Sequence, residues 1–470
     1  MLLFLLESCV FVLPAQREAH LCEVGLADAS FGDADGDGAA DCRDPEECDG
    51  LDNDGDGQVD EALYPDEDGD GYGDETRAGP CYVGWVPTPG DCDDADAGVH
   101  PGAPFERCDG KNTRCAADWT EDLDVVTLFP RDPDTWELGE PSDVTDQFMS
   151  ATPQAFTLYD GELLQVCPAR DGAYEVTLVT AADATSVGIH GVLPGDGCDT
   201  GGPDTFPTLS GGGETPVTLQ GSARGTRVDI DCLGITGGGV LGAIGGGLIV
   251  GPTVNATVSR SAIWGNSGAW FGGVWNLGSL TLDAVVILGN SVLDPADDDG
   301  GGGIRSEGTG SLEVVGGRLV GNESAYDGGG ATILLGEARF YGTTFGKREG
   351  GNVAVYRGGA LAARAGTTVE LYGVRMLGNR VEYTMGGAIF TAGALSCFKD
   401  DEGAGSMVLN TTGEPGTGGV FLAGGQFTSY GCDIAGNSGA DLYIDPIGSA
   451  VTPPGPCFAC DAAGCAEIAC

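Results

Sequence analysis

The chain has 470 residues, which is enough for two or three domains. Its 72 acidic and 21 basic residues give a formal net charge of −51, which argues against nucleic acid or an anionic membrane as a partner, since both require a basic face. The 17 cysteines cluster toward both ends, and in an exported chain so many cysteines indicate disulfides.

Residues 1–20 have the character of a degenerate export signal. The apolar segment is short and no lysine or arginine precedes it, unlike an ordinary signal peptide. Leu6-Glu7-Ser8-Cys9 resembles a bacterial lipobox, so three alternatives stay open: cleavage near Ala15, lipid attachment at Cys9, or a wrongly assigned start. No other apolar run approaches the ~20 residues that a membrane-spanning helix needs, so we predict no transmembrane span.

Residues 21–124 form an acidic module in which Asp-x-Asp-x-Asp-Gly occurs three times, each time with a further aspartate three residues beyond the glycine. The aspartates of these loops are Asp33, Asp35, Asp37 and Asp41, then Asp52, Asp54, Asp56 and Asp60, then Asp66, Asp68, Asp70 and Asp74. In such a loop, positions 1, 3 and 5 turn their carboxylates toward one point, and the glycine at position 6 permits the bend. Position 9 then closes the shell of a hard cation. We predict that the loops bind Ca²⁺; a solvated acidic linker is the alternative.

An EF-hand places a bidentate glutamate at position 12, but these loops have Asp44, Leu63 and Arg77 there. The flanking segments also lack long amphipathic helices. The loops therefore resemble the short structural sites of thrombospondin type-3 and dockerin modules rather than calcium sensors. The resemblance implies weak affinity, on the order of 10⁻⁴–10⁻³ M.

A second resemblance includes the cysteines of this module. Cys48–Glu61 and the run Asp91-Cys-Asp-Asp-Ala-Asp96 resemble a metal-binding motif repeat of secreted myxobacterial and related proteins. This resemblance adds Asp91, Asp93 and Asp96 to the predicted Ca²⁺ ligands. The repeat also occurs in a surface copper-associated protein of methanotrophs, but 5 Met and 3 His leave few soft or imidazole ligands for copper. Lys111 replaces a ligand position in the closing segment of the repeat, so we expect no metal there.

We predict that residues 125–165 are a linker and an N-terminal cap, and that residues 166–450 form a solenoid. Glycine pairs recur roughly every 28 residues in the second region, which is typical of a repeat architecture. The pairs are Gly272-Gly273, Gly302-Gly303, Gly329-Gly330, Gly358-Gly359, Gly386-Gly387 and Gly418-Gly419.

Between the glycine pairs, the sequence predicts short strands and a column of asparagines. Ser279–Asp283 alternates polar and apolar residues, so Leu280 and Leu282 should lie on one face. Apolar segments end at Asn266, Asn290, Asn322, Asn379 and Asn437, and Asn410 and Lys347 are expected to fill the two gaps in this series. Because one such unit cannot bury its apolar face alone, we predict stacked copies with a ladder of asparagine amides.

Gly-Gly-Ala-Ile at 386–389, together with the asparagine segments, resembles the repeats of chlamydial polymorphic outer-membrane proteins and of right-handed β-helix proteins. The opening segment, which includes Val166-Cys167-Pro168, is similar as well. The resemblance covers residues 166–445. It implies an all-β fold, namely a right-handed parallel β-helix, preceded here by an N-terminal calcium-loop and disulfide-rich module.

Residues 451–470 form a cysteine-rich tail. Four cysteines so close together are compatible with zinc, but their spacing is not that of paired Cys-x₂-Cys motifs, and two small disulfides are favoured. Cys397 and Cys432 are expected one coil apart and are therefore candidates for a further disulfide.

Many β-helix proteins act on polysaccharides, and such sites need facing carboxylates or aspartates beside a basic residue. Asp229 and Asp231 share a strand face but have no further acid close in the sequence. No catalytic or cofactor-binding residue is therefore predicted. We expect a bacterial protein, secreted or at the cell surface or outer membrane, that is structural or adhesin-like and contacts glycans or envelope proteins. A polysaccharide lyase or hydrolase and a metal-scavenging surface protein are the alternatives.

Overall fold

The computed structural model describes residues 63–468, with gaps at 80–81, 83, 104–110, 117–123, 131–138, 140, 150–153, 194–197, 199–205, 240–243, 295–298, 384, 400–405, 409, 413–416, 446–448, 451–456 and 462–463. The described residues fall into two compact units, one up to residue 116 and one from residue 124 onward. The predicted export signal and the first two predicted calcium loops lie outside the described residues.

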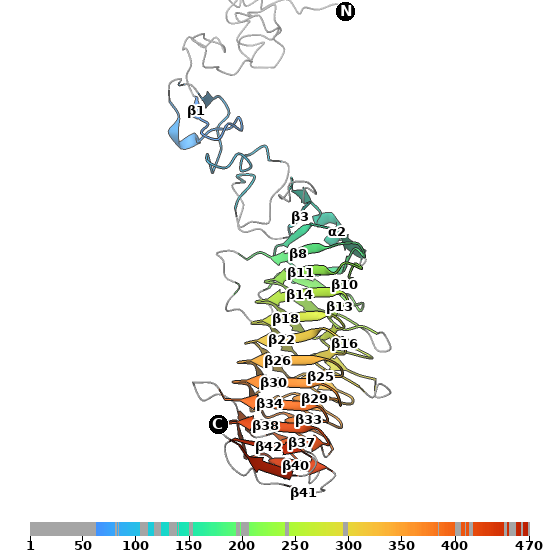
Figure 1. The fold of residues 1–470 in the computed structure, drawn as a ribbon. Helices are drawn as coiled ribbons and strands as arrows, with labels where there is room; N and C mark the ends of the chain where they lie inside the picture. The colour runs from blue at the N-terminus through green and yellow to red at the C-terminus, as the bar shows by residue number, and fades with distance from the viewer. Residues whose placement is uncertain are drawn as a thin grey trace, which may run out of the picture. The chain divides into compact units, whose positions relative to one another are not determined.

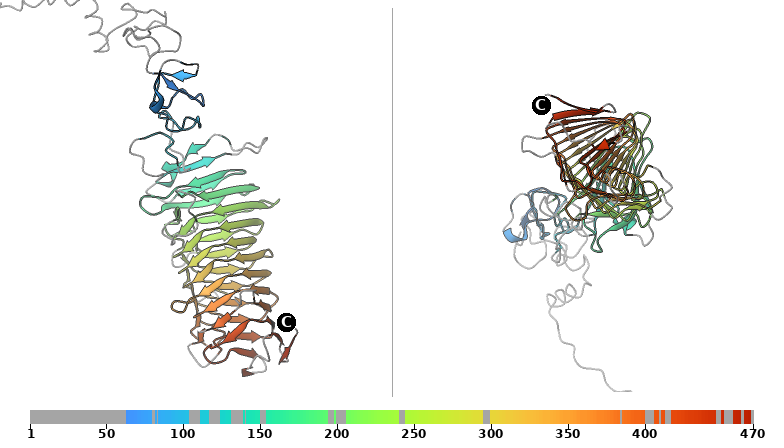
Figure 2. Two further views of the ribbon diagram at one scale, coloured as in Figure 1. Left: turned by 90° about the vertical axis from the view of Figure 1, so that its left-hand side faces the viewer. Right: turned by 90° about the horizontal axis from the view of Figure 1, so that it is seen from below.

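The second unit is a parallel β-solenoid of about eight turns, as the sequence predicts (Figure 1). A representative turn runs through β17 (Val274–Asn276), β18 (Ser279–Asp283), β19 (Val286–Leu288) and β20 (Ser291–Val292) before β21 (Ile304–Ser306) begins the next. Equivalent strands of successive turns pair in parallel and lie one above another (Figure 2). Each turn therefore contributes one strand to each of three long sheets, and the six turns from β16 to β36 also contribute one to a short fourth sheet.

Sheet 1 has fourteen strands and includes both end caps. Its strands are β3 (Val126–Phe129), β4 (Ser142–Asp143), β6 (Leu163–Val166), β8 (Ser186–Gly191), β11 (Thr226–Asp231), β14 (Val254–Ser259), β18, β22 (Ser311–Val315), β26 (Glu337–Tyr341), β30 (Thr368–Tyr372), β34 (Ala394–Phe398), β38 (Gln426–Tyr430), β42 (Cys457–Asp461) and β43 (Gly464–Glu467). Strands β6 to β38 of this sheet pair in parallel.

Sheets 2 and 3 form the other two long sides and join at β7, which pairs with strands of both. Sheet 2 contains β9 (Thr208–Ser210), β12 (Gly234–Thr236), β15 (Ala262–Trp264), β19, β23 (Arg318–Val320), β27 (Thr344–Gly346), β31 (Arg375–Leu377), β35 (Ser406–Val408) and β39 (Asp433–Ala435). Sheet 3 contains β5 (Gln154–Leu158), β7 (Tyr174–Thr180), β10 (Val217–Leu219), β13 (Leu248–Val250), β17, β21, β25 (Ala331–Ile333), β29 (Leu361–Ala363), β33 (Ile389–Thr391), β37 (Val420–Ala423), β40 (Leu442–Asp445) and β41 (Ser449–Ala450). The short sheet 4 contains β16 (Ser267–Gly268), β20, β24 (Glu323–Ser324), β28 (Val353–Ala354), β32 (Arg380–Val381) and β36 (Thr411–Thr412).

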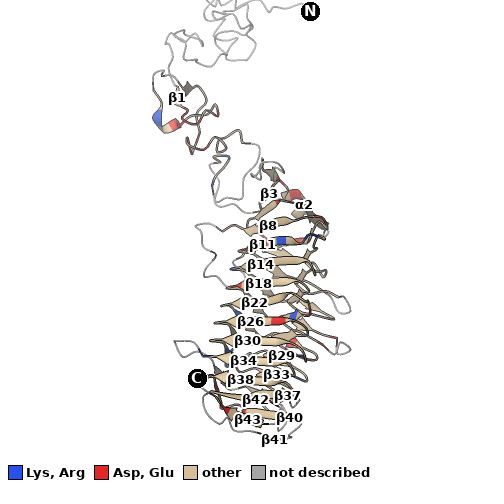
Figure 3. Ribbon diagram, viewed as in Figure 1, with Lys and Arg blue, Asp and Glu red and all other residues tan. Residues whose placement is uncertain are grey.

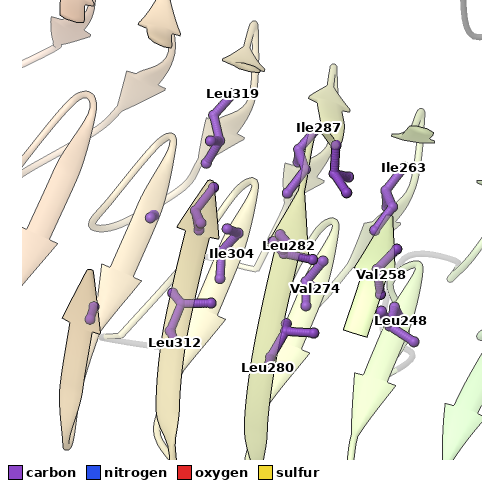
Figure 4. Close-up of a cluster of buried hydrophobic side chains, with 14 of the residues drawn as sticks. Leu248, Val258, Ile263, Val274, Leu280, Leu282, Ile287, Ile304, Leu312 and Leu319 are labelled. Carbon is purple, nitrogen blue, oxygen red and sulfur yellow. The ribbon is translucent and has the colours of Figure 1, made fainter. Parts of the chain in front are cut away.

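The interior of the solenoid is filled by apolar side chains that alternate with outward-facing residues along each strand. Leu280 and Leu282 are buried on the inner face of β18, as the sequence predicts, and Val369 and Leu371 repeat the pattern in β30. Figure 4 shows such side chains pointing between the sheets, with Leu280 and Leu312 at equivalent positions of adjacent turns. Burial of these residues is the main contribution to the stability of the solenoid.

A ladder of buried asparagines follows sheet 2 at the corner toward sheet 4. From Asn290 onward, each Oδ1 accepts hydrogen bonds from the main-chain N–H and from Nδ2 of the asparagine one turn earlier, at 2.9 to 3.1 Å. The predicted Asn410 belongs to the ladder, but Lys347 does not. Five residues, 347–351, separate β27 from Asn352 where only Gly378 separates β31 from Asn379, and Asn352 takes the ladder position instead. The members of the ladder are Asn266, Asn290, Asn322, Asn352, Asn379, Asn410 and Asn437.

The glycine pairs lie at the corner that leads into sheet 3. One column there is glycine in six successive turns, because a Cβ at Gly329 would lie 2.5 Å from the carbonyl carbon of Val353 and 2.6 Å from the carbonyl oxygen of Gly359. The pairs at 358–359 and 386–387 are offset by one residue, so that their second glycine occupies this column. The column contains Gly272, Gly302, Gly329, Gly359, Gly387 and Gly418.

Both ends of the solenoid are covered. At the N-terminal end, β3 pairs antiparallel with β6, and α2 (Thr145–Phe148) places Phe148 against Phe156 and Tyr174. At the C-terminal end, β42 and β43 form an antiparallel hairpin that pairs with β38. Such caps protect the sheet edges that a solenoid would otherwise expose.

Disulfides reinforce the second unit at several points. Cys397 and Cys432 are bonded across adjacent turns, as predicted, and Cys198 is bonded to Cys232. In the tail, Cys460 is bonded to Cys465, and Cys457 is also disulfide-bonded, so the three described tail cysteines are in disulfides. Among the described residues, no helix has the length and apolar character needed to cross a membrane.

Candidate metal centre

The first unit is a small framework of turns that brings two aspartate-rich segments together. Strand β1 (Tyr64–Pro65) pairs antiparallel with β2 (Trp85–Val86), and the 3₁₀ turn η3 (Glu75–Arg77) follows the first aspartate loop. The carbonyl of Gly73 accepts hydrogen bonds from the N–H groups of Gly90 and Asp91, which fixes the second aspartate segment beside the first. The Cys92–Cys115 disulfide closes the second segment.

The loop that begins at Asp66 is folded around its own carboxylate. Asp66 accepts hydrogen bonds from the N–H of Gly69 at 2.6 Å and of Gly71 at 3.1 Å. Both glycines have positive φ, +86° and +91°, which other residues adopt only with strain. The two glycines therefore permit the loop to close, and the carboxylates of Asp66, Asp68 and Asp70 converge, with one oxygen of each within 4.8 Å of the others.

In four carboxylates of this region, one oxygen accepts a hydrogen bond and the other does not. The Oδ1 atoms of Asp68, Asp70, Asp91 and Asp94 accept main-chain N–H groups at 2.8 to 3.3 Å. The Oδ2 atoms of the same four residues are buried and have no hydrogen-bond donor. A buried acceptor without a donor is costly, and four such oxygens in a small region could hold a cation.

The second segment contributes Asp91 and Asp94 to this cluster. Asp91 is only 5% exposed, and burial together with the nearby carboxylates of Asp70, Asp68 and Asp94 raises its pKa to about 6. The pKa of Asp68 is raised as well, by burial and by Asp70. The sequence pattern predicted Asp91 as a ligand but not Asp94, whose position depends on a hydrogen bond from the N–H of Glu67 in the other loop.

Two further residues, His100 and Arg77, lie beside the cluster of carboxylates. His100 stacks on Tyr72 and places Nε2 4.0 Å from Oδ2 of Asp70, while its Nδ1 accepts the N–H of Gly102. Arg77 lies 3.8 Å from Oδ2 of Asp94 but makes its closer contact, 2.6 Å, with Glu67. A single nearby guanidinium does not balance the carboxylates of the cluster.

The other sequence-predicted ligands of this unit lie elsewhere. Asp74 caps η3 by accepting from Thr76, at 2.6 Å from Oγ1 and 2.9 Å from the main-chain N–H, and these hydrogen bonds lower its pKa. Asp93 and Asp96 both accept from Nζ of Lys111, at 3.0 and 2.9 Å. The predicted ligands Asp33, Asp35, Asp37, Asp41, Asp52, Asp54, Asp56 and Asp60 lie outside the described residues.

The donor set of the cluster consists of carboxylate oxygens. Such oxygens suit a hard cation such as Ca²⁺ or Mg²⁺, whereas copper prefers imidazole, thiolate or thioether ligands. The residues that could hold the ion are Asp66, Asp68, Asp70, Asp91 and Asp94. These residues fit the Ca²⁺ ion that the sequence predicts, although they come from two loops rather than one.

The two carboxylates considered for catalysis on the solenoid are both paired with arginines. Asp229 accepts from Arg227 at 3.0 Å, and Asp231 forms an ion pair with Arg260. The two aspartates lie on β11 at positions that face outward, as their spacing predicts.

Comparison with known proteins adds no assignment: no family model, curated protein or solved structure matches this chain.

Proposed function

We propose that the protein is an exported, calcium-stabilised structural protein of the bacterial cell surface or exterior, whose β-helix presents binding surfaces. The observation on which the proposal depends is the set of four buried Oδ2 atoms without donors, on Asp68, Asp70, Asp91 and Asp94. A cation would satisfy these oxygens together. Extracellular modules use weak Ca²⁺ sites of this type for rigidity, since the ion is abundant outside cells.

Disulfides support the extracellular part of the proposal. Bonds such as Cys92–Cys115 and Cys397–Cys432 form and persist in oxidising compartments and are rare in the cytosol. The β-helix also suits a scaffold, because its side chains form regular columns and its corners can vary in length.

The proposed role is structural and adhesive rather than catalytic. Asp229 and Asp231, the candidates for a polysaccharide-cleaving site, each have an arginine as partner and share one strand. The partners we propose are cell-surface glycans or envelope proteins. Clearing assays on pectin, alginate and glycosaminoglycans test this point, and cleavage of any of them would contradict the non-enzymatic role.

Calorimetric titration of the full chain tests the metal site. We expect Ca²⁺ to bind with a Kd on the order of 10⁻⁴–10⁻³ M and to raise the thermal unfolding temperature. Mg²⁺ at equal concentration is the matched control, since a flexible multi-carboxylate site favours the larger ion. Absence of both heat and thermal stabilisation with Ca²⁺, or preferential binding of Cu²⁺, would rule out the proposed site.

A further inference from the structure

A groove of about 810 Å³ lies over the outer face of sheet 2, from β15 to β31. Cys198 and Phe206 line one side of it, and the Cys198–Cys232 disulfide holds the first of these residues against the solenoid. The groove belongs to the second unit alone. A volume in this range is typical of sites for small organic ligands.

Two columns of side chains form the floor of the groove. In register along the stack, the first column is Val286, Arg318 and Thr344, and the second is Leu288, Val320, Gly346 and Leu377. The first column includes the cation Arg318, and the second is apolar throughout. Because successive turns are about 4.8 Å apart, both columns run along the stack as continuous stripes.

Of the four cations that line the groove, Arg260 is paired with Asp231, and the other three have no acidic partner among the described residues. Arg318, Lys347 and Arg348 line the groove, are exposed and form no ion pair with any acid in the part of the chain that the structure describes, although acids outnumber bases more than threefold in this chain. Most other arginines of the β-helix are paired, as Arg305 is with Glu307. Charged residues are sparse on the strands of the solenoid, so three unpaired cations at one groove are a local exception (Figure 3).

The other residues that line the groove restrict the class of ligand that it can bind. Besides the cations, Ser261 and Thr344, the described lining residues are aliphatic, glycine or the two at its edge, and none of them has a carboxylate or an amide side chain. Glu349 follows Arg348 in the chain but does not line the groove. Sugar chains are commonly held by aromatic platforms together with amide or carboxylate side chains, and the aliphatic floor of this groove offers none of these among the described residues. An aliphatic stripe beside unpaired cations instead fits a molecule that is apolar along its length and anionic at one end.

We propose that this groove binds a free single-chain anionic amphiphile, such as a long-chain fatty acid. The acyl chain would lie along Leu288, Val320 and Leu377, and its carboxylate would pair with Arg318, Lys347 or Arg348. The proposal adds a ligand class to the proposed scaffold function and does not depend on the metal site. Its failure would therefore leave the calcium experiments unaffected.

A chain-length series tests the apolar part of the proposal. Saturated fatty acids of increasing length are titrated against the full chain below their micellar concentration, with displacement of a fluorescent fatty acid as the readout. We expect the affinity to rise about twofold to fourfold per methylene until the groove is filled. The fatty alcohol of equal length should bind about tenfold more weakly, since it lacks the charge. An affinity that is independent of chain length would overturn the proposal.

Substitutions test whether the fatty acid binds in this groove. Lys347→Ala with Arg348→Ala should weaken fatty-acid binding about tenfold, and Leu288→Glu should abolish it by placing an anion on the apolar stripe. Arg224→Ala, which removes an exposed cation away from the groove, is the matched control and should have no effect. Circular dichroism and the unfolding temperature verify that each variant is folded. Unchanged binding in both groove variants would overturn the proposal.

A vesicle assay separates a free amphiphile from a membrane lipid. Phosphatidylglycerol and phosphatidylcholine vesicles are co-sedimented with the protein. Binding of free fatty acid that phosphatidylglycerol vesicles do not displace supports the proposal. Binding to anionic vesicles without any binding of free fatty acid would mean that the cations contact a membrane surface, and would overturn it.

Discussion

The side-chain Nδ2 of Asn322 donates to Oδ1 of Asn352 at 2.9 Å and to the main-chain carbonyl of Ile287 at 3.0 Å. Its own Oδ1 accepts from the N–H and the Nδ2 of Asn290, both at 3.0 Å. Every polar atom of this fully buried amide is therefore satisfied, and the residue connects three successive turns. Full satisfaction is what makes a buried polar group stabilising rather than costly.

Replacing Asn322 should destabilise the solenoid more than any exposed asparagine does. Asn322→Ala leaves two donors of Asn290 and the carbonyl of Ile287 without their partner, so we expect a loss of about 3 kcal/mol. Guanidinium unfolding followed by circular dichroism measures this loss of stability. Asn255→Ala on the exposed side of β14 is the matched control and should change stability by less than about 0.5 kcal/mol. Equal effects of the two variants would contradict the role of the ladder.

The glycine column makes a second prediction about close packing between turns. Gly329→Ala would place a Cβ within 2.6 Å of the main chain of both Val353 and Gly359, which cannot move without separating the turns. Gly289→Ala provides the comparison, since Gly289 has a φ of +61° but open space around it, and should cost only about 1 kcal/mol. We expect Gly329→Ala to lower the unfolding midpoint far more. Similar midpoints for the two variants would show that the turns can separate at little cost.

The fold was predictable because its determinants recur in the sequence. Glycines at a close-approach corner and asparagines at the next one leave a period that is visible without coordinates. Lys347 was misplaced because an insertion moved the true ladder residue to Asn352, and sequence spacing alone does not reveal which residue returns to the column. The groove on sheet 2 was not predictable, because lining residues such as Leu288 and Val320 are neighbours only through the register of the strands.

The candidate metal centre was predictable only in its local part. Asp66, Asp68 and Asp70 converge because their spacing and the intervening glycines fold one loop, which is a short-range effect. Asp94 enters through a contact between two segments, and Asp74 is used to cap a turn of its own. Short-range spacing thus identifies a loop, while the choice among nearby aspartates is made by tertiary contacts.

The two classes of aspartate should respond differently to substitution. Asp91→Asn removes a charge from the cluster and supplies a donor, so we expect the metal-free protein to become more stable at neutral pH while the number of bound Ca²⁺ ions falls by one. Asp96→Asn alters a side chain that contacts Lys111 and should leave the number of bound ions unchanged. Calorimetry gives the stoichiometry, and thermal unfolding in a chelator gives the stability. Loss of an ion in Asp96→Asn but not in Asp91→Asn would place the site elsewhere.

The raised pKa of Asp91 also predicts how pH acts on the first unit. The pKa is about 6 in the folded protein, against about 3.9 for an unperturbed aspartate in the unfolded chain. The folded state therefore binds the proton more tightly, so in a chelator the stability of this unit should rise as the pH falls through 6 toward 4. With saturating Ca²⁺ the proton competes with the ion, and the stability should fall over the same window instead. Thermal unfolding between about pH 7 and pH 5, with and without the ion, measures both slopes, and Asp91→Asn should flatten them. Slopes of the same sign in both conditions would mean that protons and Ca²⁺ do not share this cluster.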